Sequence, residues 1–126
     1  MDKTIINSPL APAPIGPYSQ AVRAGGMLFV SGQVALIPGT SQLAIDNIQV
    51  ETEQVMQNLK AILQEAGLGF AHVVKVTIFL KDMGLFSAVN DIYARYFESG
   101  FPARETVAVR GLPKDVNVEI SLIAAA

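Results

Sequence analysis

The sequence contains no cysteine and a single histidine, His72, among its 126 residues. Without cysteine there is no disulfide framework, no thiolate nucleophile and no cysteine-bound zinc or iron–sulfur site. One histidine cannot by itself build a histidine-rich metal site, nor the pair of histidines that usually supplies acid and base in RNA cleavage. The residue types therefore predict no metal centre.

Charged residues are also scarce: they make up 16% of the chain, whereas hydrophobic residues make up 51%. This composition argues against disorder. The formal net charge of -2 gives no electrostatic reason to expect nucleic acid or an anionic membrane as partner. Residues 24–45 are uncharged, but Gly32 and Pro38 are among the residues that break them up, so no membrane span is predicted. The segment Met1–Thr4 leads into no apolar stretch of a secretory signal. We expect one domain, residues 1–126, in the cytoplasm.

Hydrophobic periodicity predicts four strands and two helices, preceded by an extended proline-rich segment at residues 9–17. The strands are expected at Met27–Val34, Val73–Leu80, Arg104–Val109 and Val116–Ala124. The helices are expected from a capping box at Asp46 and Gln49 to about Ala66, closed by Gly67, and from Leu85 to Glu98.

Alternation within these strands predicts a sheet with two unlike faces, because neighbouring residues of a strand point to opposite sides. One face is fully apolar and would be covered by the two helices: Leu28, Val30, Val34, Val74, Val76, Ile78, Leu80, Val118, Ile120 and Leu122. The other is too apolar for open water and too polar for a core: Met27, Phe29, Ser31, Gln33, Lys75, Thr77, Phe79, Arg104, Thr106, Asn117, Glu119, Ser121 and Ile123. Since no helix remains to cover this mixed face, we expect a second subunit there, with a polar site between subunits.

The segment Phe101–Glu119 carries the chemistry of the chain, as two strands joined by a Leu112–Asp115 turn. If these strands pair, Arg104 and Glu119 face the same small space. An arginine fork suits a substrate carboxylate, and a carboxylate beside it can orient or deprotonate water. Spacing alone leaves a structural ion pair between the two residues open as the alternative.

Several stretches of the chain resemble the RidA (YjgF) family of small imine deaminases. They are Ile15–Gln20, Val30–Gln33, Val89–Tyr93, Phe101–Arg104 and Leu112–Val116, the last continuing to Glu119 and Ile120. Together they span nearly the whole chain in the order of the family. The resemblance implies an α+β fold of the chorismate-mutase-like type, a mixed sheet with two helices on one face. It also implies a homotrimer with its sites in clefts between subunits.

The resemblance assigns roles residue by residue. Arg104 matches the arginine that holds the substrate carboxylate, and Glu119 matches the glutamate that positions the attacking water. The further substrate-binding positions are Tyr18, Ser31, Gly32, Asn90 and Thr106. Thr106 replaces a cysteine common in the family, which bears on thiol-dependent behaviour more than on deamination. Taken singly, Ser31 and Thr106 also fit strand residues bonded to the backbone.

The function implied by the resemblance is hydrolysis of reactive 2-imino acids to 2-keto acids and ammonia, without a metal or organic cofactor. The substrates would be 2-iminopropanoate, 2-iminobutanoate and their enamine tautomers, and the role would be control of metabolite damage. A protonated imine is already electrophilic, so the protein need only hold the carboxylate and place one water molecule. One alternative is a trimer that binds or senses small keto acids through Arg104 without turnover. A second is a chaperone-like or RNA-cleaving role, against which the acidic balance and single histidine argue.

Overall fold

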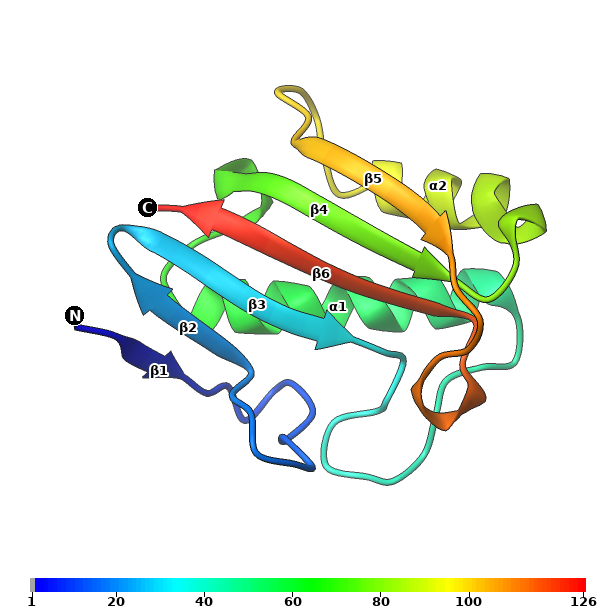
Figure 1. The fold of residues 1–126 in the computed structure, drawn as a ribbon, viewed down its shortest axis with the longest axis horizontal. Coiled ribbons are helices and arrows are strands. Elements are labelled where there is room, and N and C mark those ends of the chain that lie inside the picture. Colours follow the sequence, from blue (N-terminus) through cyan, green and yellow to red (C-terminus); the bar gives the residue numbers. More distant parts are fainter. Residues whose placement is uncertain (1) are drawn as a thin grey trace.

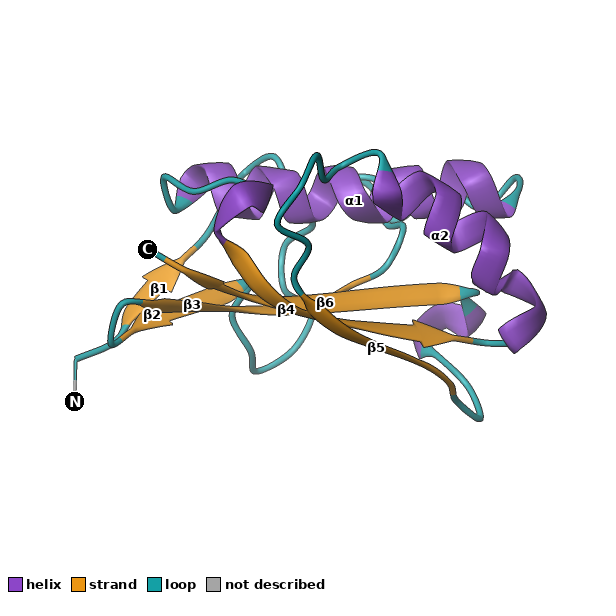
Figure 2. Cartoon of the chain, turned by 90° about the horizontal axis from the view of Figure 1, so that it is seen from above, coloured by secondary structure: helices purple, strands orange, loops and turns teal. Residues whose placement is uncertain are grey.

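Six strands form one mixed sheet in the computed structural model, which describes residues 2–126 (Figure 1). In chain order they are β1 (Thr4–Ile6), β2 (Ala21–Ala24), β3 (Met27–Gln33), β4 (Val73–Leu80), β5 (Ala103–Ala108) and β6 (Val118–Ala125). The spatial order is β1-β2-β3-β6-β4-β5, and all neighbours are antiparallel except β4 and β5. Both helices lie on one side of this sheet (Figure 2), so the expected α+β architecture is confirmed.

Strand β4 lies between β5 and β6, and the expected pairing of those two strands is therefore wrong. The residues of β4 are almost all apolar, and a central place gives the backbone of β4 a ladder on both sides. The connection from β5 to β6 is accordingly not a hairpin turn. It contains a short 3₁₀ turn, η3 (Pro113–Asp115), in which Lys114 and Asp115 have φ angles of 57° and 56°.

The first helix, α1 (Ile48–Glu65), is capped one residue later than expected. The Asn47 side chain accepts a hydrogen bond from Val50 N at 2.8 Å, so the predicted capping box at Asp46 and Gln49 is wrong. The prediction for the other end is confirmed, since Gly67 closes the helix with a φ of 75°.

The second helix, α2 (Phe86–Ala94), follows the 3₁₀ turn η2 (Met83–Leu85) and is shorter than the expected Leu85–Glu98. Beyond Ala94 the backbone tightens, because Arg95, Tyr96 and Phe97 each donate an N–H to the carbonyl three residues earlier. A further 3₁₀ turn, η1 (Phe70–His72), leads into β4. Neither helix of residues 2–126 is both long and apolar enough to cross a membrane.

Two β-bulges shift the predicted alternation by one residue. At the start of β4, Val73 is buried and Val74 is 43% exposed, so Val74 does not belong to the apolar face. In β3 the register shifts between Val30 and Gln33, which places Gln33 opposite Ile120 and buries it on the helix side. The expectation that Gln33 lies on the mixed face is wrong for this reason.

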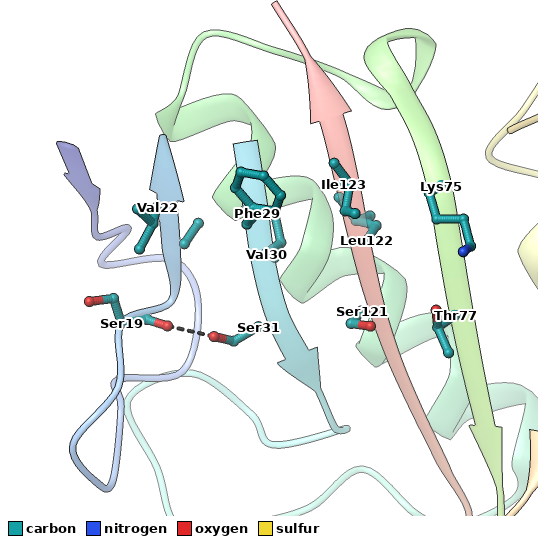
Figure 3. Close-up of a pocket in the computed structure, with 11 residues that line it drawn as sticks. Ser19, Val22, Phe29, Val30, Ser31, Lys75, Thr77, Ser121, Leu122 and Ile123 are labelled. Atoms are coloured by element: carbon teal, nitrogen blue, oxygen red, sulfur yellow. Dashed lines mark hydrogen bonds between the residues drawn. The ribbon is translucent and has the colours of Figure 1, made fainter. Parts of the chain in front are cut away.

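The core lies between the two helices and the sheet face that they cover (Figure 2). Helix α1 contributes Val55, Leu59 and Ile62 at helical spacing, all fully buried. The opposite face has no helix over it, and Phe29 and Val107 remain 46% and 40% exposed there. A hollow of about 380 Å³ lies on this face, lined by Ser19 and by side chains of β2, β3, β4 and β6. Figure 3 shows the residues that line it. The uncovered mixed face predicted from alternation is confirmed in this monomer.

Candidate functional site

The side chain of Arg104 lies on the helix side of the sheet, not on the mixed face. In the parallel ladder Arg104 is level with Val76, and Thr106 is level with Ile78. Val76 and Ile78 are both buried beneath the helices. The expected mixed-face position is wrong for Arg104 and for Thr106. Strand β5 pairs with β4 and not with β6, so the register with β4 decides which face each residue of β5 points to.

Three side chains of α2 surround the Arg104 guanidinium. Its Nη1 donates to Asn90 Oδ1 at 2.8 Å, and its Cζ lies 5.0 Å from the centre of the Tyr93 ring and 5.6 Å from that of Phe86. These distances are those of cation–π contacts. Residues 86, 90 and 93 are spaced by four and three along α2 and so present one face of the helix to the arginine.

The guanidinium borders a cavity of about 480 Å³ lined by Asn90, Tyr93, Ala94, Phe101, Pro102 and Arg104. Burial raises the pKa of Tyr93 above its ordinary value, while the charge of Arg104 acts in the opposite direction. Within residues 2–126 Arg104 forms no ion pair, so the positive charge is held in place without a carboxylate partner. This arrangement suits the binding of an anion that brings its own carboxylate.

Glu119 borders a second cavity, of about 430 Å³, at the opposite face. The cavity is mostly apolar and is lined by Pro12, Ala13, Ile15, Tyr18, Gln20, Ser31, Gly32, Gln33, Val34, Leu36, Pro113, Lys114 and Glu119. No side chain or backbone group of residues 2–126 donates a hydrogen bond to the carboxylate of Glu119 or forms an ion pair with it. Burial raises the pKa of this carboxyl above its ordinary range. An unpaired, half-buried carboxylate of this kind is a candidate for proton transfer.

Gly32 permits the position of Glu119. A Cβ atom added at Gly32 would collide with Glu119 Oε2 and would lie 2.9 Å from Cδ. The carboxylate therefore packs directly against the backbone of β3, beside its bulge. Only glycine leaves this room, which gives Gly32 a steric role in the site.

Two buried amides hold the walls of the Glu119 cavity. Gln20 accepts from Ser8 N at 2.6 Å and donates to Ser8 O and Pro12 O at 3.0 and 2.9 Å, which fixes the proline-rich segment against β2 and β3. Asn58 of α1 donates to Val34 O and Leu36 O at 3.0 Å each. The proline-rich segment is thus part of the cavity wall.

The predicted site residues fall into two groups on opposite faces of the chain. Tyr18, Ser31, Gly32 and Glu119 line one cavity, whereas Asn90 and Arg104 line the other. Ser31 Oγ donates to Ser19 O at 2.6 Å (Figure 3), the backbone bond that was the alternative interpretation of this residue.

Thr106 stands apart from both groups, because it lines neither cavity. Its Oγ1 is buried and has no hydrogen-bond partner within residues 2–126. The hydroxyl lies on the same side of β5 as Arg104, two residues further on.

Phe86 and Tyr93 are partners of Arg104 that the sequence did not predict, because hydrophobic periodicity indicates only that they belong to the apolar face of a helix. Their spacing around Asn90 was a signal for a shared helix face. It could not indicate which strand that face meets. Within residues 2–126 no group of three or more histidine, aspartate or glutamate side chains could hold a metal ion.

Comparison with known proteins identifies relatives over the whole chain. The family model described as Endoribonuclease L-PSP matches residues 8–126. A RutC family protein of Synechocystis is 53% identical over 126 residues, covering 98% of this chain and 97% of its own. A protein of Dermatophagoides farinae named 2-iminobutanoate/2-iminopropanoate deaminase is 45% identical, covering 96% of this chain and 94% of its own. The crystal structure of E. coli TdcF with bound serine superimposes with a TM-score of 0.93 at 37% identity, covering 98% of each chain.

Proposed function

The chain belongs to the RidA (YjgF) family, and from this premise we propose that it hydrolyses 2-imino acids to 2-keto acids and ammonia at a site shared by two copies of the chain. The observation that carries the proposal is the state of Glu119. It is a half-buried carboxylate of raised pKa, without a partner in residues 2–126, at the wall of a largely apolar cavity. Such a group can accept a proton from water, because no cation of its own copy neutralises it.

The second requirement is a grip on the substrate carboxylate, and Arg104 supplies it. Asn90, Tyr93 and Phe86 hold the guanidinium, which leaves most of its N–H donors free for a ligand. A planar fork of donors binds a carboxylate at two points, which fixes the orientation of the attached carbon as well as its position.

One copy of the chain cannot bring these two groups to one substrate. Arg104 is level with Val76 and Glu119 with Phe79, on strands that flank β4. Strand spacing and rise put their Cα atoms about 14 Å apart, with side chains on opposite faces. In a 2-imino acid, however, the carboxylate is bonded directly to the imine carbon.

In our proposal, a second copy of the chain brings its Arg104 to the substrate that Glu119 of the first copy acts on. The uncovered sheet face, with its exposed Phe29 and Val107, has the composition of a subunit contact. Docking the β5–α2 edge of one copy beside the Glu119 cavity of the next would join the two halves of the site. Repetition of such a head-to-tail contact closes into a ring, and the family resemblance supplies the number three.

The proposed reaction needs no group beyond these. The carboxylate of Glu119 accepts a proton from a water molecule as the water oxygen bonds to the imine carbon, and the electron pair of the C=N bond moves to nitrogen. Starting from the protonated imine, this addition leaves an NH₂ group on the carbon. The Glu119 carboxyl protonates that nitrogen, and the C–N bond breaks as the hydroxyl proton passes to a water molecule. The products are a 2-keto acid and ammonia, and Glu119 returns to its carboxylate form.

Two of the relatives support the substrate class. The Dermatophagoides farinae protein carries the name of this deaminase. The TdcF structure contains serine, which shares with a 2-imino acid a carboxylate and a nitrogen on the neighbouring carbon. The Arg104 site suits the carboxylate of such a ligand, and the Glu119 cavity suits the neighbouring carbon that carries the nitrogen.

The test is direct. An amino acid oxidase generates 2-iminopropanoate or 2-iminobutanoate in situ, and formation of the 2-keto acid is followed with and without the protein. We expect the protein to accelerate keto-acid formation above the spontaneous rate. Binding of the keto acid without any acceleration would instead identify a binding or sensing protein.

A further inference from the structure

Glu51 is a fully buried carboxylate that the proposed reaction does not use. It lies in the first turn of α1, and both of its oxygens accept hydrogen bonds from the start of β6. Oε2 accepts from Asn117 N at 2.8 Å and from Val118 N at 3.2 Å, and Oε1 accepts from Asn117 Nδ2 at 2.8 Å. Burial of a carboxylate is costly unless hydrogen bonds replace water, so this position demands its three donors.

These hydrogen bonds hold the two residues that come immediately before Glu119, the proposed catalytic residue, in the sequence. Val118 precedes Glu119, and the chain ahead of Asn117 has no strand ladder to guide it. That segment contains Lys114 and Asp115, whose backbones have positive φ angles in the left-handed region. This backbone conformation is energetically unfavourable for residues that carry a Cβ atom. Glu51 therefore fixes the point at which an irregular turn becomes the strand that carries Glu119.

The Glu119 carboxylate is in direct contact with the backbone of β3. It packs so closely on Gly32 that a single added Cβ would collide with it. Seven residues after Glu51 on α1, the buried Asn58 holds Val34 O and Leu36 O in the opposite cavity wall. One face of α1 thus anchors both walls between which Glu119 lies.

We propose that Glu51 is a positioning residue, which through Asn117 and Val118 sets the place of the Glu119 carboxylate for activation of water. The inference rests on the proposed function. It predicts an effect on kcat more than on KM, because the substrate carboxylate is held by Arg104, on another strand and at another cavity. A residue that only stabilised the fold would not separate the two constants.

The test is Glu51→Gln, which keeps the size of the side chain. Its amide oxygen can still accept from the two backbone N–H groups, but the bonds lose the strength that the charge gave them. The Asn117 amide must also turn over before its Oδ1 can accept from the new NH₂. We expect kcat to fall about 10-fold or more, since an error of roughly 1 Å in a reacting group costs up to about 100-fold. The pKa of Glu119, followed by ¹³C NMR of its carboxyl carbon, should change in the same variant.

A double variant restores the bonding pattern. In E51Q/N117D the new carboxylate at position 117 accepts from the glutamine NH₂, so three hydrogen bonds form again with the net charge unchanged. We expect kcat to return to within about threefold of the original, as the bonds are replaced in kind. Thr52→Val is the matched control, because it removes a buried bond, Thr52 Oγ1 to Ile48 O at 2.7 Å, that does not involve β6. Its kcat should not change.

An E51Q protein that is less stable, yet keeps both kcat and the pKa of Glu119, would overturn the proposal. If E51Q does not fold, Asn117→Ala provides the comparison, since it removes only the Oε1 bond and leaves both backbone bonds. Unchanged kcat and an unchanged Glu119 titration in that variant would equally contradict a positioning role. If the unmodified protein hydrolyses no imine, the proposed function fails, and the NMR titration still tests Glu51 by itself.

Discussion

Arg104 and Glu119 point to opposite faces of one sheet, and strand β4 separates the strands that carry them. Within one copy of the chain their positions exclude the structural ion pair that was the alternative interpretation of the two residues, and no such pair forms within residues 2–126. The same positions make the proposed site depend on a second copy of the chain.

Arg104→Lys should lower kcat/KM for the imine about 10- to 100-fold, because lysine keeps the charge but loses the planar two-point grip and its bond to Asn90. Steady-state kinetics measure the loss, and light scattering checks that assembly is retained. Arg110→Lys, at an exposed arginine, is the control and should have no effect. Equal activity of R104K and the original protein would show that the carboxylate is held elsewhere.

Glu119→Gln should lower kcat about 10²- to 10⁴-fold, the usual contribution of a general base, because glutamine cannot accept the proton of water. Affinity for the keto-acid product should be retained, and calorimetry measures it alongside the rate. Glu65→Gln removes an exposed carboxylate of the same charge as a control. A rate equal to that of the original protein would leave the mechanism without its base.

Glu119→Gln should also stabilise the folded protein at neutral pH. Burial raises the pKa of this carboxyl above its ordinary value of 4.5, so the fold favours the protonated form, and stability falls as pH rises through the raised pKa. Glutamine resembles the protonated form at every pH. Urea unfolding at equal protein concentration should therefore favour E119Q at pH 7, and the difference should shrink towards pH 4. Greater stability of the original protein at pH 7 would mean that Glu119 has a favourable ionic partner.

Gly32→Ala should displace the Glu119 carboxylate and lower kcat about 10²-fold while the protein still folds, because the atom in the way is the end of a side chain. Circular dichroism and kinetics together separate these effects. Gly111→Ala is the control, since a Cβ there meets no heavy atom within 4 Å. Unchanged turnover in G32A would show that the exact place of the carboxylate does not matter.

The sequence predicted the elements of the core better than their arrangement. The β-branched run of β4 and the spacing of Val55, Leu59 and Ile62 in α1 are local patterns, and each formed as expected. The place of β4 between β5 and β6 depends on which backbones share a ladder, and a local pattern does not contain that information. Strands β1 and β2 have only three and four residues, too few for a period of two to stand out.

The same limit applied to the site. The resemblance assigned all of the candidate residues to one site, and the structure brings Tyr18, Ser31, Gly32 and Glu119 to one cavity. The face on which Arg104 lies could not be predicted, because it follows from the parallel register with Val76. The bulges near Val74 and before Gln33 added single-residue shifts, which put Val74 and Gln33 on the faces opposite to those predicted.

Mixing R104K with E119Q tests most directly whether two copies form each site. The two impaired variants are unfolded together and refolded at equal concentration, and imine hydrolysis is compared with that of each variant treated alone. If Arg104 and Glu119 act from different copies, random assembly leaves about one quarter of the sites with both original residues, so about that share of activity should return. Activity no higher than the mean of the two separate variants, in a mixture shown to have exchanged subunits, would contradict the shared site.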